Sequence, residues 1–150
     1  MLGYLSSSRL KEREKTLHML HGFISELRDG MRYTNAPIER IVKNLLQNGD
    51  CDSAVTEAFV KEKSFIKGFD TLLNLLQNQQ RITPKDRAML QGFGGKTGKT
   101  DLEGQLIHCD FYQSRIQTQL KEAESMSQKY AKLYLSAGVL SGLGAAVLVL

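Results

Sequence analysis

The sequence predicts an all-α protein, a helical bundle of five to six helices whose long C-terminal helix continues into a transmembrane helix. Three observations support this fold class. The chain contains only two prolines in 150 residues, and its apolar residues recur at spacings of three and four, which is typical of helices. Every Asp, Glu, Lys and Arg lies before Leu133, so a polar body is followed by an apolar tail.

The first two helices are predicted from apolar stripes. In residues 9–31, apolar side chains at three- and four-residue steps share one helical face. These side chains are Leu17, Leu20, Ile24, Leu27 and Met31. Gly30 weakens that helix near its end, and a short linker at 34–36 leads to Pro37. Proline suits a first helical position, because its missing N–H has no partner there. Residues 38–46 then form the apolar face of a second helix.

Three shorter helices come next. Asp52 or Ser53 can cap a third helix, which ends near residue 63, and the apolar residues of 65–76 mark a fourth. Thr83 is the expected cap of a fifth helix, with Pro84 at its first position.

The glycine-rich segment at residues 94–98 predicts a sharp turn before the last helix. Thr100 or Asp101 can cap this last helix. From Leu102 onward no helix breaker appears, and an apolar stripe continues to the tail. The stripe consists of Leu106, Cys109 or Phe111, Ile116, Leu120, Ala123, Met126 or Ser127, Tyr130 and Leu133.

Residues 133–150 are predicted to form the C-terminal transmembrane helix. At about 1.5 Å per residue they extend roughly 27 Å, close to the thickness of a bilayer's hydrocarbon core. A core helix is the alternative, but a small bundle cannot enclose so uniform a segment. Small residues at four-residue spacing can pack against another helix in lipid. The predicted anchor and packing residues are Leu133, Ala137, Gly138, Ser141, Gly142 and Ala145.

The two ends of the chain define its predicted domains. Residues 1–8 look like the inner end of an N-terminal transmembrane segment, and they are too short for a signal peptide. Residues 9–132 form a helical domain, and residues 133–150 form the anchor. Lysines precede the anchor on the side of the helical domain, so this domain is expected in the cytoplasm.

No pattern in the sequence predicts catalysis. The run at 94–100 ends in Gly-Lys-Thr, as a phosphate-binding loop does, but Phe93 stands where that motif needs glycine. The motif also comes after a strand, whereas a helix is predicted here. His18 and His21 share a helical face, yet zinc requires four ligands in a fixed geometry. We therefore expect no enzyme activity, no metal and no other cofactor.

The charge and the cysteines also limit the function. The net charge of +4 is spread along the body, whereas a nucleic-acid surface needs clustered basic residues. A weak attraction to anionic lipid is the more natural use of it. Cys51 and Cys109 match no disulfide or metal framework, so they are expected to be free thiols. We expect neither nucleic acid nor a small-molecule substrate as a partner.

Four stretches of the sequence, taken in order, point to one known family. Residues 3–5 lead into the charged segment 9–13, Tyr33 and Pro37 flank a turn into the second helix, and 129–143 runs into the apolar end. The most specific stretch comprises Phe93, Gly94, Gly98, Asp101 and Gln105. Over essentially the whole chain these features resemble the stage III sporulation protein AB family of endospore-forming bacteria.

The resemblance implies a non-enzymatic membrane protein of the mother cell–forespore channel complex. Its helical domain would be similar to the cytoplasmic domains of the platform protein in type II secretion and type IV pilus systems. The implied location is the mother-cell membrane around the forespore. The implied partners are the stage III sporulation protein AA ATPase, other membrane proteins of the stage III sporulation A operon and the lipid bilayer; a homo-oligomer stays open.

Two points remain open at the level of sequence. The turn at 94–98 either shapes the helical hairpin only or docks a partner. A generic tail-anchored helical tether is the alternative function, and a nucleotide-binding membrane enzyme is disfavoured by Phe93.

Overall fold

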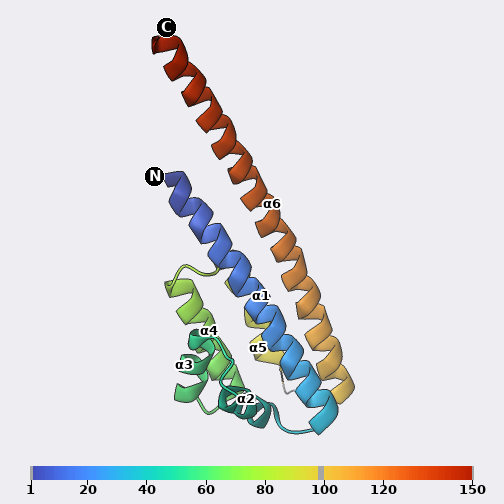
Figure 1. Ribbon diagram of the computed structural model, residues 1–150. Coiled ribbons are helices and arrows are strands. Elements are labelled where there is room, and N and C mark those ends of the chain that lie inside the picture. Colours follow the sequence, from blue (N-terminus) through green and yellow to red (C-terminus); the bar gives the residue numbers. More distant parts are fainter. Residues whose placement is uncertain (1, 98–99, 150) are drawn as a thin grey trace.

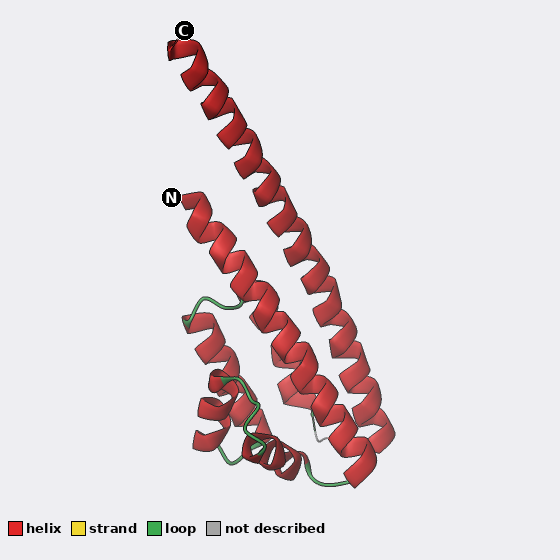
Figure 2. Cartoon of the chain, in the orientation of Figure 1, coloured by secondary structure: helices red, strands yellow, loops and turns green. Residues whose placement is uncertain are grey.

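The computed structural model describes the backbone of residues 2–97 and 100–149, and the side chains of 8–97, 100–139 and 142. Over these residues the fold is all-helical, with six helices and no strand, as the sequence predicts (Figures 1 and 2). The helices are α1 (Leu2–Thr34), α2 (Ile38–Gln47), α3 (Ser53–Lys61), α4 (Phe65–Asn78), α5 (Pro84–Lys96) and α6 (Leu102–Val149).

α1 and α6 form a long antiparallel pair, and the shorter helices pack around one part of it (Figure 1). α3 packs on α4, α4 on α5, and α5 on α6. We call the end that holds the α1–α2 connection and the α5–α6 turn the distal end. The opposite end, where α1 begins and α6 continues past Leu133, is the terminal end. Figure 1 shows α6 extending well beyond the start of α1.

The α1–α6 pair is built on the predicted apolar stripe of α1 and on part of the predicted stripe of α6; Met126 and Leu133 are exposed, and Tyr112 is buried in addition. All five predicted core positions of α1 are buried. The facing side chains of α6 are Cys109, Tyr112, Ile116, Leu120 and Ala123. The structure therefore selects Cys109 over Phe111, whose side chain is 55% exposed. α1 begins at Leu2, seven residues before the predicted start of the helix. It ends at Thr34, three residues after the predicted end at Met31.

A chain of aromatic rings joins five of the six helices. The rings are Phe23, Phe59, Phe65, Phe69, Phe93 and Tyr112, and consecutive centroids lie 5.3–5.8 Å apart. Such pairs contribute roughly 0.5–1.5 kcal/mol each beyond the burial of their area. The aromatic chain thus fixes α3, α4 and α5 onto the α1–α6 pair.

A buried ion pair links the middle of the α1–α6 pair to α5. Arg13 Nε donates to Asp86 Oδ2 at 2.8 Å, and Arg13 Nη2 donates to Asp86 Oδ1 at 2.9 Å. Arg13 Nη2 also donates to Gln119 Oε1 on α6 at 3.1 Å. Asp86 accepts in addition from the backbone N–H of Thr83, which completes the capping box of α5. The predicted cap at Thr83 and the proline at the first position are confirmed.

A second bidentate pair fixes the start of α3. Arg81 Nη1 and Nη2 donate to Asp52 Oδ1 and Oδ2 at 3.0 and 2.8 Å. Asp52 Oδ1 also accepts from the backbone N–H of Ala54 at 2.9 Å, so Asp52, not Ser53, is the N-cap of α3. The hydrogen bonds from Arg81 lower the pKa of Asp52 below its ordinary value of 3.8.

Three details of the predicted elements are wrong. Pro37 is the N-cap of α2 rather than its first helical residue. α3 ends at Lys61 and not near residue 63. α5 continues to Lys96, so Gly94 lies inside the helix instead of starting the turn. The helix tolerates this glycine because α5 approaches Phe69 closely there: a Cβ on Gly94 would lie 2.7 Å from Phe69 Cδ1.

Among the residues that the structure describes, no helix carries an apolar stretch long enough to cross a membrane. Much of the predicted anchor lies outside those residues, because the side chains of 140, 141 and 143–150 are not described. Both cysteines are free thiols, as predicted. Burial against α1 raises the pKa of Cys109 to about 11.

Candidate functional site

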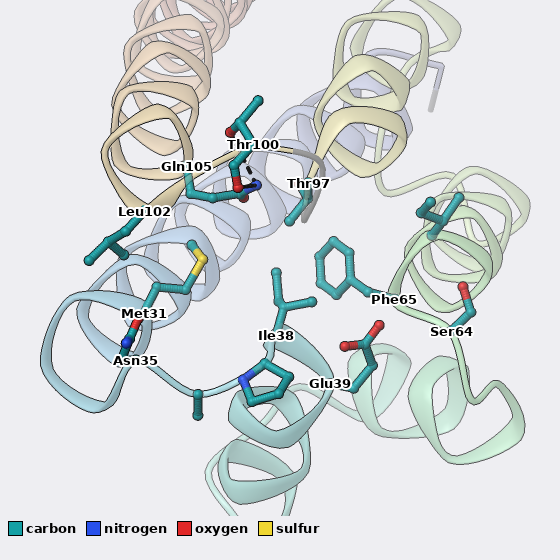
Figure 3. A pocket seen from close by; sticks show the side chains of 13 residues that line it. Met31, Asn35, Ile38, Glu39, Ser64, Phe65, Thr97, Thr100, Leu102 and Gln105 are labelled. Carbon is teal, nitrogen blue, oxygen red and sulfur yellow. Dashed lines mark hydrogen bonds between the residues drawn. The ribbon is translucent and has the colours of Figure 1, made fainter.

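The candidate site is a pocket of about 410 Å³ at the distal end of the bundle. It lies between the α1–α2 connection, the start of α4 and the α5–α6 turn (Figure 3). Met31, Ile38 and Phe65 supply apolar side chains, and Figure 3 shows them beside the polar groups of Thr97, Thr100 and Gln105, with Ser64 and Glu39 across the pocket.

The α1–α2 connection forms one wall. Asn35 adopts a left-handed conformation with φ 53°, and the hydroxyl of Thr34 accepts from the backbone N–H of Ala36 at 3.3 Å. The carbonyl of Pro37 accepts from the N–H groups of Arg40 and Ile41 at 3.0 and 3.2 Å, which starts α2. These contacts turn the chain from α1 into α2 within three residues.

Tyr33, the other predicted turn residue, lies apart from the pocket. Its exposed ring is in the last turn of α1, and the guanidinium carbon of Arg32 lies 5.5 Å from the ring centroid. Of the predicted turn pair, only Pro37 lines the site.

The end of α5 forms the second wall. The carbonyl of Phe93 accepts from the N–H of Thr97 at 3.2 Å and from its hydroxyl at 2.5 Å. His108 Nε2 lies 3.0 Å from the same oxygen. Because a carbonyl can only accept, His108 donates here from Nε2. Its ring also stacks on Phe93, with centroids 5.1 Å apart and planes 6° apart.

Asp101 and Gln105 close the turn into α6. Asp101 Oδ1 accepts from the N–H of Gly104 at 3.0 Å, and the carbonyl of Asp101 accepts from the N–H of Gln105 at 2.9 Å. This confirms Asp101 as the cap of α6. The side-chain amide of Gln105 is buried and donates to the carbonyl and hydroxyl of Thr100 at 3.4 and 3.3 Å (Figure 3).

Phe93, Gly94 and Asp101 do not line the pocket. Phe93 and Gly94 are buried in the core, where Phe93 joins the aromatic chain and Gly94 permits the approach of Phe69. Gly98 lies outside the described residues. A helix, α5, precedes the Gly-Lys-Thr run, which is the context that the sequence predicts and not that of a phosphate-binding loop.

The pocket combines apolar and polar side chains. Its hydroxyl, amide and carboxylate groups offer hydrogen bonds around an apolar floor, as binding pockets commonly do. Within the described part of the chain, no group of three or more His, Cys, Asp or Glu side chains lies close enough to hold a metal ion. Sequence reasoning missed Met31 and Thr97 as pocket residues, because their part in it depends on contacts between segments far apart in the chain.

The predicted anchor residues lie on the part of α6 that extends beyond the bundle. Leu133, Ala137, Gly138 and Gly142 are exposed, and a Cβ added to either glycine would meet nothing within 4 Å. The side chains of Ser141 and Ala145 are outside the described residues.

The fold and the site define a class: a helical bundle on a long antiparallel helix pair, with a recessed pocket at one end. Its family is stage III sporulation protein AB. The model of that family matches residues 1–150, so the chain belongs to it, and its role lies in stage III of sporulation. Searches of curated proteins and of solved structures found no match.

Proposed function

We propose that this protein is a non-enzymatic, membrane-anchored platform in the stage III sporulation complex, and that its distal pocket docks the stage III sporulation protein AA ATPase. One observation carries the proposal. Pro37 from one family-like stretch and Gln105 from another, 68 positions away in the sequence, line the same recessed surface. The antiparallel pairing of α1 and α6 brings both turns to the distal end, and an open pocket remains between them.

The extension of α6 supports the membrane anchor. Leu133, Leu135 and Val139 are 65%, 70% and 60% exposed. Exposed apolar clusters of this kind mark contacts with lipid or protein, and residues 133–150 contain no charge. A bilayer would bury these side chains at roughly 25 cal/mol per Å² of apolar area. The helical domain then lies in the cytoplasm of the mother cell, at the membrane around the forespore.

The shape of the bundle supports a platform role. α1 and α6 bring the terminal end to the membrane, and they hold the distal pocket at the far end of a continuous helix pair. Arg28 Nε donates to Asp110 Oδ1 at 2.7 Å across this pair, near the pocket. A rigid pair of this kind can transmit the position of a docked ATPase to other membrane proteins of the complex.

The proposal is tested by co-purification of the detergent-solubilised full chain with the ATPase. Glu39→Arg combined with Leu102→Arg changes two exposed side chains at the pocket without disturbing the core. We expect the amount of ATPase that co-purifies with this variant to fall at least about tenfold, because an introduced charge at a docking surface opposes binding. Sporulation should stop at stage III in cells that carry it.

The matched control is Phe111→Arg combined with Glu124→Arg, which changes one apolar and one acidic residue exposed on α6. It should retain the ATPase as the wild type does. Failure of the wild type to associate in any detergent, or an equal loss in the control, would refute ATPase docking at this pocket. If the protein stays in the membrane fraction but no ATPase co-purifies with it, a generic tail-anchored tether would be favoured.

A further inference from the structure

A second pocket opens at the terminal end of the bundle. It has a volume of about 640 Å³, which is within the usual range for ligand sites. Residues 9–13 of α1, the α4–α5 connection and the part of α6 before Leu133 form its walls. Its apolar lining consists of Leu10, Ile82, Pro84 and Met126.

Two cations at this pocket are available to an anion. Arg9 is exposed, and no ion pair of the described residues involves it. Lys85 Nζ lies 3.7 Å from Glu122 Oε2, with both side chains largely exposed. Exposed pairs of this kind contribute little and exchange readily. By contrast, Arg13 and Arg81, which also line the pocket, are engaged by carboxylates of Asp86 and Asp52.

The pocket lies at a defined depth below the exposed apolar part of α6. Tyr130 lines it and precedes Leu133 by about 4.5 Å along the helix axis, and Met126 precedes Leu133 by about 10 Å. The headgroup layer of a bilayer is roughly 5–8 Å thick on each side. If the bilayer core begins at Leu133, Tyr130 lies in the headgroup layer, and the pocket extends from there toward the bundle. Tyrosine is typical of that depth.

The three chain segments that contribute to this pocket carry an excess of basic residues. Residues 9–15, 81–87 and 121–132, which include most of the lining residues, contain ten Lys and Arg and five Asp and Glu, a net charge of +5. The rest of the chain contains ten and eleven, a net charge of −1. The positive end therefore faces a membrane whose anionic lipids attract basic residues by about 1 kcal/mol each near the surface.

We propose that this pocket binds one anionic phospholipid of the surrounding bilayer. Its phosphate lies between Arg9 and Lys85, and the first methylenes of an acyl chain contact Leu10 and Met126. The inference rests on the proposed function in one respect only, namely that α6 enters a bilayer after Leu133. The bound lipid would fix the tilt of the bundle at the membrane surface.

The test uses the full chain in a neutral detergent, labelled with ¹³C at its methionine methyl groups. Met126 reports on this pocket, and Met31, which lines the distal pocket, is an internal reference. The titrants are dihexanoyl-phosphatidylglycerol, the zwitterionic dihexanoyl-phosphatidylcholine and inorganic phosphate. We expect the NMR signal of the Met126 methyl group, and no other, to shift until it saturates. The anionic lipid should reach the midpoint of this shift at a concentration at least about tenfold lower than the other two titrants.

Variants locate the binding site. Arg9→Gln combined with Lys85→Gln should raise the midpoint about tenfold or more, since charge-assisted hydrogen bonds to the phosphate are lost. Arg40→Gln combined with Lys43→Gln removes two exposed cations of α2 and should leave the midpoint unchanged. Thermal unfolding of both variants verifies that each is folded.

Three outcomes would overturn the proposal. Equal shifts of the Met126 signal with both lipids would mean that the pocket binds acyl chains and does not distinguish an anionic headgroup from a zwitterionic one. A shift by inorganic phosphate at the same concentration would make it a free-anion site, and an equal loss in the α2 variant would indicate only diffuse charge attraction. Because the short-chain lipid reaches the pocket without a bilayer, binding and membrane anchoring succeed or fail separately.

Discussion

Gly94 and Gly95 are adjacent in α5 but have opposite surroundings. A Cβ on Gly94 would lie 2.7 Å from Phe69 Cδ1, whereas one on Gly95 would meet nothing within 4 Å. Gly94→Ala should therefore destabilise the protein by about 1–3 kcal/mol, because the added methyl overpacks the core. Gly95→Ala should be neutral or stabilise it by up to about 1 kcal/mol, as helix propensity predicts.

Urea unfolding of both variants, followed by the helical circular dichroism signal, measures this difference. Equal midpoints would contradict the close approach of α5 to α4. The same comparison distinguishes core packing from turn geometry. If these glycines were needed for a turn and not for packing, Gly95→Ala would lower the unfolding midpoint more than Gly94→Ala.

At the scale of elements, the start of α3 depends on an ion pair with the α4–α5 connection. Arg81 lowers the pKa of Asp52 below 3.8, so the folded state binds fewer protons than the unfolded state at low pH. The stability that this pair contributes is fully present above pH of about 4, and it is lost as the pH falls through the lowered pKa. Asp52→Asn and Arg81→Met should both weaken this acid dependence.

The measurement is the urea midpoint between pH 5 and pH 2 for the wild type and the two variants. The wild type should lose more stability over this interval than either variant. An acid dependence that is unchanged in both variants would show that other carboxylates are responsible. Asp52 also caps α3, but Asn caps a helix as well as Asp does, so the Asp52→Asn variant changes the ion pair and leaves the cap in place.

At the scale of the whole molecule, α6 joins the bundle to its proposed anchor. Leu135→Arg combined with Val139→Arg places two charges in the exposed extension, and each costs about 2.5–3.5 kcal/mol at the centre of a transmembrane helix. We expect this variant to leave the carbonate-resistant membrane fraction. Phe111→Arg, an exposed position within the bundle, should remain in that fraction; loss of both, or of neither, would contradict the anchor.

Local features of the chain were predictable from sequence. The stripe from Leu17 to Met31 and the cap at Thr83 depend on residues within one or two helical turns, so periodicity and capping rules predict them. For the same reason the sequence predicts Thr100 or Asp101 as the cap of α6, and the structure selects Asp101. The family resemblance, which rests on short motifs in order, is also a property of the sequence, and the family model confirms it.

Contacts between distant segments were decided only by the tertiary structure. Arg13 and Asp86 are 73 positions apart, and no local pattern in the sequence pairs them. No local pattern brings Pro37 close to Gln105 at the distal pocket either. Gly94 was predicted to start a turn because glycine weakens helices by about 1 kcal/mol, but the contact with Phe69 favours the helix. The sequence by itself determined helices and caps, since these depend on near neighbours. The pockets and ion pairs depend on how the helices pack.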